Sequence, residues 1–555
     1  MSNVLFDIKD FERVGIDAKM LDSTLTDLGM ELESITNGVV EISITPNRPD
    51  MLDFTGIVRA INYMHRKRYP KDNYYASSSQ IAKTITVSES VSNIRPYISA
   101  IVARNINLSG NALKYLINFT EKICDTYGRK RKKIAIGLHD LSKISGEITY
   151  DVTDNGFMFP LNEDVKRSFT DILKSSDMGI KYGDLIKNKD GLIPYISDEK
   201  NVLAIIPILN SNSTKVTSST KDLFVDITGI SQDAIDAIAN ILSCSFIDMG
   251  ATIEQCKVVY KKSNIIVPSL KMRDITIKRF RIDETIGVKF ETREAISFIE
   301  RLGYNGAVYG TSLIAKVPPY RIDVLNDQDV IEDIAIGFGY NRIEPLNVLS
   351  SKQGLFNDMT LYTNKVAMLM VGLGFMECSN NYLTSENANF DMMNITKIER
   401  SSVVSIEYSK SPSINMLRTH IMPNLLQNLS ISAHETMPQR IFEIGSIFKA
   451  ERRNFKESLH LSFIVEHSKS NFSEIKSNII AILNMLNIKY EFKMLSDPAF
   501  IEGRCAAIYS ANKLIGRFGE LHPSVLVNFS LEEPAAGAEI CLIEDVKYDS
   551  SHIKA

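Results

Sequence analysis

The sequence predicts an α+β protein built from several domains. Its 555 residues exceed what one hydrophobic core holds, and at about 150 residues per domain they suggest roughly four domains. Hydrophobic residues make up 44% of the chain and charged residues 23%, which is typical of globular domains. Strand-like and helix-like stretches are interspersed, without a repeat period or a low-complexity tract.

The first domain is expected to span residues 1–78. A β-branched run at 39–44 predicts a strand, and the motif T-P-N-R-P-D at 45–50 predicts a tight, rigid turn. Apolar residues then recur at helical spacing after Asp53, which can cap the helix. These apolar residues are Phe54, Ile57, Val58, Ile61 and Met64.

The other three domains are expected at 81–262, 264–346 and 347–555. β-branched runs at 98–106 and 223–227 predict strands of the second domain. Apolar residues at helical spacing predict helices in all three domains. The predicted helices are 111–127, 232–242, 292–302, 329–338, 361–371 and 476–486.

Composition excludes several classes of protein. A net charge of −4 argues against a protein that coats nucleic acid by bulk electrostatics, although a local RNA-binding patch remains open. The six cysteines include no C-x-x-C pair, so neither a zinc ribbon nor a disulfide framework is indicated. The chain has no signal-peptide pattern and no apolar run of about 20 residues. We therefore expect a cytoplasmic protein without a membrane partner.

Three carboxylates lie at helical spacing in the third domain. Asp329, Glu332 and Asp333 are separated by three and four residues, which places them on one helix face. Mg²⁺ would relieve their repulsion, because this ion prefers oxygen ligands. Acids also favour the first helical turn without any metal, and on spacing alone that explanation is the commoner one.

Five consecutive cations occupy residues 129–133. They could contact RNA phosphates, although a solvated loop is the commoner explanation for such a run. His139, His434 and His522 lack the spacing of zinc ligands. A phosphate-binding loop of the G-x-x-x-x-G-K-[ST] type is also absent.

Motifs in the third and first domains resemble those of phenylalanyl-tRNA synthetase beta subunits. V-P-P-Y-R-x-D at 317–323, D-x-x-E-D at 329–333 and G-Y-x-x-I-x-P at 339–345 resemble the signature module of that family. The N-R-P-D turn at 47–50 resembles its first module. The resemblance implies that Mg²⁺ is bound by the side chains of Asp323, Asp329, Glu332 and Asp333.

The fourth domain resembles the synthetase-like module of the same family. The matching pieces are L-R-T at 417–419, P-x-L-L at 423–426, F-E-I-G at 442–445 and G-E-L-H-P at 519–523. The resemblance implies a class II aminoacyl-tRNA synthetase fold, an antiparallel sheet flanked by helices. A class II site needs arginines that clamp ATP phosphates, but no arginine follows Phe529. We therefore expect a non-catalytic module that serves as a partner surface.

Residues 210–229 resemble the editing module of archaeal and eukaryotic beta subunits. Such a module hydrolyses tyrosine wrongly attached to tRNA-Phe, because an apolar pocket rejects one added hydroxyl only about 10²-fold. The candidate residues are Asn210, Ser211, Asp226 and Thr228. Asp226 and Thr228 share one face of the predicted strand, although they could equally just close that strand into a turn at Gly229.

The resemblance covers nearly the whole chain and implies a subunit role. An α₂β₂ tetramer with an alpha subunit would attach phenylalanine to tRNA-Phe, and ATP and phenylalanine would bind through the complex. Aminoacylation is expected on the alpha subunit. Two alternatives remain, a free-standing hydrolase of mischarged tRNA and a non-enzymatic RNA-binding scaffold. Co-purification with a similar amount of a second synthetase-like chain would separate the subunit from both.

Overall fold

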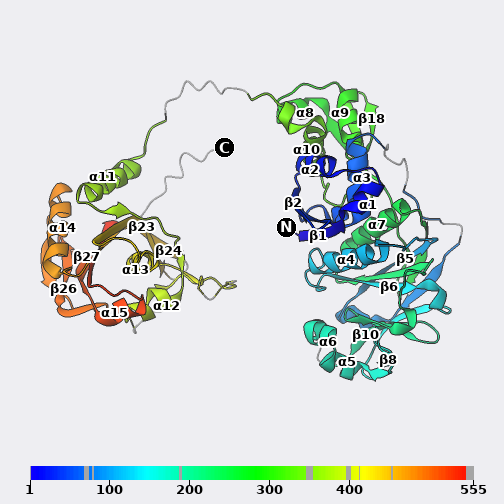
Figure 1. Ribbon diagram of the computed structural model, residues 1–555, viewed down its shortest axis with the longest axis horizontal. Coiled ribbons are helices and arrows are strands. Elements are labelled where there is room, and N and C mark those ends of the chain that lie inside the picture. Colours follow the sequence, from blue (N-terminus) through cyan, green and yellow to red (C-terminus); the bar gives the residue numbers. More distant parts are fainter. Residues whose placement is uncertain are drawn as a thin grey trace. The chain divides into compact units, whose positions relative to one another are not determined.

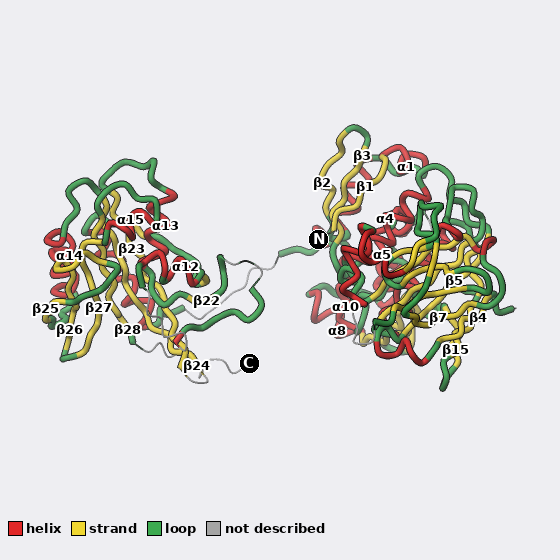
Figure 2. Tube along the Cα trace, turned by 90° about the horizontal axis from the view of Figure 1, so that it is seen from below, coloured by secondary structure: helices red, strands yellow, loops and turns green. Residues whose placement is uncertain are grey.

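The computed structural model describes residues 2–67, 74–77, 80–186, 191–345, 354–395, 402–409, 411, 413–451 and 454–544 (Figure 1). They form two compact units, 1–347 and 348–555, each with its own hydrophobic cores. Both units combine helices with strands, as the predicted α+β class requires (Figure 2). None of the described helices is long and apolar enough to cross a membrane.

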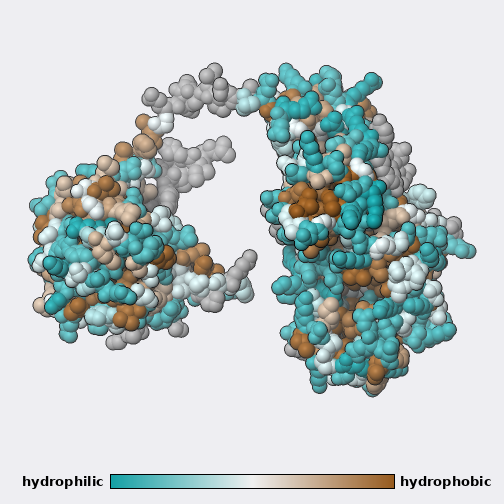
Figure 3. All heavy atoms as spheres, in the orientation of Figure 1, coloured by the Kyte–Doolittle hydropathy of each residue, from teal (hydrophilic) through white to brown (hydrophobic). Residues whose placement is uncertain are grey.

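Unit 1 begins with a three-stranded antiparallel sheet in the order β1-β3-β2. The predicted helix after Asp53 is observed with Asp53 as its N-cap residue, and its apolar face joins the main core of the unit. Figure 3 shows an apolar patch over this part of the unit, where Leu5, Ile35 and Val39 are exposed. The elements are β1 (Ser2–Asp7), α1 (Ile8–Arg13), α2 (Ala18–Asp27), β2 (Glu31–Thr36), β3 (Val39–Ile44) and α3 (Phe54–Met64).

Two sheets follow. The four-stranded sheet β14-β5-β13-β6 is antiparallel, and all seven residues of β13 are buried. The second sheet is mixed, because β4 pairs in parallel with β7 and β15. The elements are β4 (Lys83–Val87), β5 (Tyr97–Arg104), α4 (Ala112–Asp125), β6 (Ile134–Asp140), β7 (Ile148–Thr153), β8 (Phe157–Met158), β9 (Arg167–Ser168), α5 (Phe169–Ser175), α6 (Asp177–Tyr182), β10 (Ile193–Ser197), β11 (Val202–Ile205), β12 (Leu209–Asn210), β13 (Leu223–Gly229), α7 (Gln232–Asp248), β14 (Thr252–Glu254), β15 (Cys256–Val259) and β16 (Asn264–Val267).

The last part of unit 1 is a three-stranded antiparallel sheet with three helices. Its strand order is β17-β19-β18, and α9 and α10 contribute apolar side chains to the core that also contains α3. The elements are β17 (Arg273–Lys278), α8 (Arg279–Ile286), α9 (Thr292–Glu300), β18 (Asn305–Tyr309), β19 (Ser312–Val317) and α10 (Asp327–Phe338).

Buried charges join three segments of unit 1. Arg59 of α3 donates to Asp248 at the end of α7 at 2.9 Å, and its guanidinium lies 3.6 Å from the Asp50 carboxylate. The same guanidinium stacks 3.8 Å from the ring centroid of Tyr320. Arg48 binds Asp50 through two hydrogen bonds of 2.9 Å. The N-R-P-D turn is therefore not only a rigid turn, because it contributes Arg48 and Asp50 to this buried charge network.

Unit 2 is built around a seven-stranded sheet in the order β20-β23-β24-β28-β27-β26-β25. All neighbouring pairs are antiparallel except β20 with β23. Helices α11 and α14 pack in one core with the sheet, and α13 and α15 pack in another. The elements are α11 (Asp358–Gly372), β20 (Met376–Glu377), β21 (Leu383–Thr384), α12 (Glu386–Asn389), β22 (Met416–Leu417), α13 (Met422–Ile431), β23 (Gln439–Glu451), β24 (Asn454–Glu466), α14 (Phe472–Met485), β25 (Glu491–Met494), β26 (Phe500–Ser510), β27 (Lys513–Leu521), α15 (Pro523–Asn528) and β28 (Ala535–Ile543).

Candidate functional site

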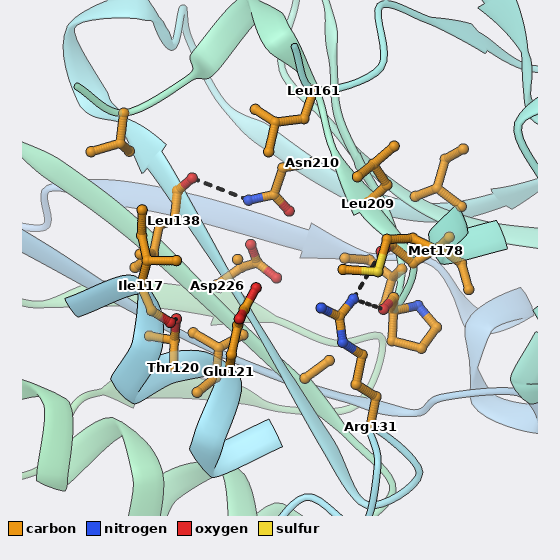
Figure 4. A pocket seen from close by; sticks show the side chains of 18 of the residues that line it. Ile117, Thr120, Glu121, Arg131, Leu138, Leu161, Met178, Leu209, Asn210 and Asp226 are labelled. Carbon is orange, nitrogen blue, oxygen red and sulfur yellow. Dashed lines mark hydrogen bonds between the residues drawn. The ribbon is translucent and has the colours of Figure 1, made fainter. Parts of the chain in front are cut away.

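A cavity of about 360 Å³ opens beside β13 in unit 1. Its walls come from α4, β6 and the segment 205–210, and most of them are apolar (Figure 4). The polar side chains that line it are Thr120, Glu121, Arg131, Asn162, Asn210, Lys215 and Asp226. Sites for small organic groups have this composition, with apolar walls and a few polar groups that fix orientation.

Asp226 is the buried carboxylate of this cavity. It lies on β13 with 0% exposure, opposite Gly137 of β6. A Cβ atom at position 137 would stand 2.1 Å from Asp226 Oδ2, so glycine is required there. His139 Nε2 lies 3.0 Å from the same oxygen, whereas Asp226 Oδ1 has no hydrogen-bond partner among the described residues. The carboxylate therefore keeps one oxygen free for a ligand.

His139 fixes the orientation of that carboxylate. Its Nδ1 lies 2.7 Å from the Thr214 hydroxyl, and both side chains are buried. With the proton on Nε2, the imidazole donates to Asp226 and accepts from Thr214, which satisfies both ring nitrogens. The sequence pattern did not identify Gly137 and His139 as site residues. The strand-like run I-A-I-G-L-H-D at 134–140 nevertheless places both on the same strand face, because they are two positions apart.

Only two of the four predicted editing residues line the cavity, Asp226 and Asn210. Asn210 donates to the Leu138 carbonyl at 3.1 Å, and Figure 4 places its side chain beside the Asp226 carboxylate. The structure places Thr228 elsewhere, where its hydroxyl accepts from Arg95 Nε at 3.1 Å. Burial lowers the pKa of Arg95 to about 10. Ser211 donates to the Phe159 carbonyl at 3.1 Å and also lies outside the lining.

The cation run at 129–133 contributes one wall residue. Arg131 Nη1 donates to the carbonyls of Pro207 at 3.0 Å and Ile208 at 2.8 Å (Figure 4). Its guanidinium carbon also lies 4.6 Å from the ring centroid of Tyr182. The run is therefore more than a solvated loop, because Arg131 ties α6 to the segment that closes the cavity, while Arg129, Lys130 and Lys132 remain exposed.

The acidic residues of the third domain are divided among different partners. Asp323 and Asp333 both accept from Arg321, at 2.9 Å and 2.6 Å. Asp333 also accepts from the Tyr304 hydroxyl. Asp329 accepts from the backbone N–H groups of Leu325 at 2.6 Å and Asn326 at 2.9 Å, in a capping box. Glu332 is exposed.

This geometry bears on the expected magnesium site, which stays a prediction. Within the described parts of the chain, no group of three or more Asp, Glu, His or Cys side chains could hold a metal ion. Arg321 pairs with Asp323 and Asp333, and Asp329 caps the helix. A Mg²⁺ ion shared by Asp323, Asp329, Glu332 and Asp333 would therefore require the three aspartates to leave these partners. Helix spacing placed three of them on α10 but could not show that an arginine would occupy the space between carboxylates.

Replacing Asp333 by asparagine should lower the free energy of unfolding by about 2 kcal/mol, because buried Arg321 loses a charge-assisted partner. Adding EDTA to the wild-type chain should leave its melting temperature unchanged. Thermal unfolding followed by circular dichroism checks both results, with exposed Glu332→Gln as the neutral control. One tightly bound metal per chain, lost together with stability in Glu332→Gln, would contradict this arrangement.

Unit 2 contains a cavity of about 400 Å³ whose charged residues are largely paired. Arg517 binds Asp497, and Glu539 Oε1 lies 3.3 Å from His460 Nδ1 and 3.7 Å from His420 Nδ1. Burial opposes ionisation of Glu539, but hydrogen bonds and charge from the two histidines hold its pKa well below the ordinary value. Burial lowers the pKa of His460, while Cys541 and Glu539 together raise it to about 9.

Comparisons with known proteins cover nearly the whole chain. Family models match at residues 82–245 (B3/4 domain), 275–340 (tRNA synthetase B5 domain) and 346–542 (Phenylalanyl tRNA synthetase beta chain CLM domain). A solved N-terminal fragment of the phenylalanyl-tRNA synthetase beta-subunit from Pyrococcus horikoshii is 27% identical with a TM-score of 0.58. The match covers 61% of this chain and 99% of the fragment.

Two curated relatives extend the match over both units. The phenylalanine–tRNA ligase beta subunit of Archaeoglobus fulgidus is 33% identical over 533 residues, covering 95% of this chain and 96% of that protein. The beta subunit of Methanococcoides burtonii is 32% identical over 521 residues, covering 93% and 95%. With all three family models in order along the sequence, the chain belongs to the phenylalanine–tRNA ligase beta subunit family.

Proposed function

We propose that this chain acts within a phenylalanine–tRNA ligase and that its unit 1 cavity hydrolyses tyrosine wrongly attached to tRNA-Phe. The observation that carries the editing role is Asp226, a fully buried carboxylate with one oxygen unpartnered among the described residues, in a largely apolar cavity. A tyrosyl ring would occupy the apolar walls. Its hydroxyl would donate to Asp226 Oδ1, a bond that phenylalanine cannot make.

This arrangement supplies the selectivity that an apolar synthetic pocket lacks. A site built to hydrogen-bond a substrate hydroxyl rejects the analogue without it by about 10⁴-fold or more, because its own polar group is then left unpaired. Phenylalanyl-tRNA would therefore pass the cavity unhydrolysed. Hydrolysis itself needs an oriented water molecule and no protein nucleophile, and Asn210 and Glu121 line the same cavity as polar groups to orient it.

The proposal also covers the four modules of the chain and its assembly with an alpha subunit. The four modules are 1–78, 81–262, 264–346 and 347–555, the last being a class II synthetase-like module. Its docking face for an alpha subunit in an α₂β₂ tetramer would be α11 and β20, where Leu361, Met368, Val371 and Met376 are exposed. ATP and phenylalanine would bind on the alpha subunit, in the cytoplasm, and magnesium would accompany the ATP phosphates.

The test of editing uses the assembled enzyme and tRNA-Phe charged with either amino acid. Rapid release of tyrosine and slow release of phenylalanine support the proposal. A chain that deacylates tyrosyl-tRNA-Phe fully without any partner would favour the free-standing hydrolase. A chain that binds tRNA-Phe without hydrolysing either form would favour the scaffold.

The purified chain alone should not catalyse phenylalanine-dependent exchange of pyrophosphate into ATP. Adenylate formation needs fixed cations aimed at the ATP phosphates. In unit 2, Arg517 is paired with Asp497, and buried Arg418 lies 2.7 Å from Glu443. Exchange should appear when an alpha subunit is added, as measured with labelled pyrophosphate. Exchange by the chain alone, above a mock-purified control, would overturn the non-catalytic assignment.

A further inference from the structure

Unit 1 has another cavity, of about 500 Å³, that shares no lining residue with the Asp226 cavity. It lies where the end of α1, the start of α3, the start of α4 and the end of α7 meet. All four elements belong to unit 1. The editing role proposed above does not use this cavity, and the inference below is independent of it.

The walls of this cavity are aromatic. Phe54, Tyr115, Phe119 and Phe246 line it, and the last three are buried. Phe54 and Tyr115 stack with their ring centroids 5.4 Å apart and an interplanar angle of 29°. Aromatic walls bind flat apolar groups through their area and attract organic cations through their ring faces.

One buried carboxylate oxygen without a hydrogen-bond partner among the described residues lines this aromatic space. Asp53 is 5% exposed, and its Oδ2 accepts no hydrogen bond from the described residues. Beside it lies Ser245, which is 2% exposed. Burial raises the pKa of Asp53, although a hydrogen bond from Ser245, the charge of Arg59 and hydrogen bonds from Thr55 oppose this rise. A buried polar atom of this kind is costly unless something binds it.

The other charged groups of the cavity do not compete for a ligand. Asp10 accepts from Arg13 at 2.7 Å, from Asn111 at 2.8 Å and from the Tyr115 hydroxyl at 2.6 Å. Arg59 beside Asp53 is held by Asp248 and Asp50. Among the charged residues lining the cavity, Asp53 is thus the one whose carboxylate can accept a further hydrogen bond, at Oδ2.

We propose that this cavity binds a small organic ammonium ion attached to an aromatic or similar apolar group, an arylalkylamine. The ammonium would donate to Asp53 Oδ2, and the ring would lie against Phe54, Tyr115 and Phe246. The ligand supplies the donor that the carboxyl lacks, and the volume is within the range of small-molecule sites.

The test is calorimetric titration of the full-length chain with phenethylamine, beside 2-phenylethanol as its neutral analogue. Saturable binding of the amine is expected, with the alcohol weaker by about tenfold, because a charge-assisted hydrogen bond is roughly twice as strong as a neutral one. Asp53→Asn should weaken amine binding at least about tenfold. Ala112→Leu, which narrows the cavity at the start of α4, should weaken it as well.

Asp226→Asn is the matched control for the other cavity and should leave the affinity for phenethylamine unchanged. The absence of saturable binding up to about 10 mM would overturn the proposal, since such affinity is negligible. Equal affinity for amine and alcohol, or affinity unaffected by Ala112→Leu, would overturn it too. Because Ala112→Leu changes a half-buried side chain, it decides the question even if Asp53→Asn does not fold.

Discussion

Replacing Arg59 by methionine is expected to lower the free energy of unfolding of unit 1 by about 3–5 kcal/mol, the range measured when one partner of a buried ion pair is removed. Arg59 is 2% exposed, and its guanidinium contacts two carboxylates, Asp248 and Asp50, and the face of Tyr320. Methionine fills much of the same volume but removes the positive charge beside Asp248 and Asp50 inside the core. Thermal and denaturant unfolding of the chain give the measurement.

The control for this substitution is Arg13→Met. Arg13 also binds an aspartate, Asp10, at 2.7 Å, but its side chain is 73% exposed, so the change should stay within about 0.5 kcal/mol. The double variant Arg59→Met with Asp248→Asn should lose less stability than the sum of the two single variants, because neither charge is then stranded. Equal stability of Arg59→Met and Arg13→Met would show that the network does not hold the three segments together.

Local patterns in the sequence were sufficient for the longer helices and for a few strands, β3, β5 and β13. The spacing of Phe54, Ile57 and Ile61 predicted α3, and the β-branched run at 223–227 predicted β13. Helix α7 continues to Asp248, beyond the predicted end at 242. The hydrophobic pattern is interrupted there by the polar residues Ser243 and Ser245, but both are buried in the helix. Residues 545–555, which belong to the arginine-free stretch after Phe529, lie outside the described chain.

Contacts between distant residues could not be predicted from one sequence. Arg59 and Asp248 are 189 positions apart, and nothing in either local pattern indicates the partner. The same limit applies to the candidate site, where Asp226 was identified but its neighbours on β6 were not. Thr228 follows Asp226 on the same strand face, yet its hydroxyl is taken by Arg95, which comes from before β5. Periodicity assigns a side chain to a face but does not identify what covers that face.

Asp226→Ala should slow the deacylation of tyrosyl-tRNA-Phe by about 10²-fold or more, the usual loss when one directed polar contact of a preorganised site is removed. Aminoacylation with phenylalanine should stay near the wild-type rate, because the cavity lies in unit 1 and the proposed synthetic site is on the partner. Tyrosine release from purified mischarged tRNA gives the rate. Asp222→Ala is the control, since Asp222 directly precedes β13 and binds Arg104 near the surface.

His139→Gln distinguishes positioning of the carboxylate from a direct role of the carboxylate itself. His139 holds Asp226 Oδ2 at 3.0 Å, while Oδ1 has no hydrogen-bond partner among the described residues and is the proposed acceptor of the tyrosyl hydroxyl. Glutamine can still donate to Oδ2 but cannot reproduce the contact with Thr214 at the same time, so a loss of about tenfold is expected.

Gly137→Ala should approach the Asp226→Ala rate, because the added Cβ would stand 2.1 Å from Oδ2 and must displace the carboxylate. If Asp226→Ala deacylates tyrosyl-tRNA-Phe as fast as the wild type, Asp226 is not part of the site. If only His139→Gln and Gly137→Ala are slow, the cavity is used but its hydroxyl acceptor is another group.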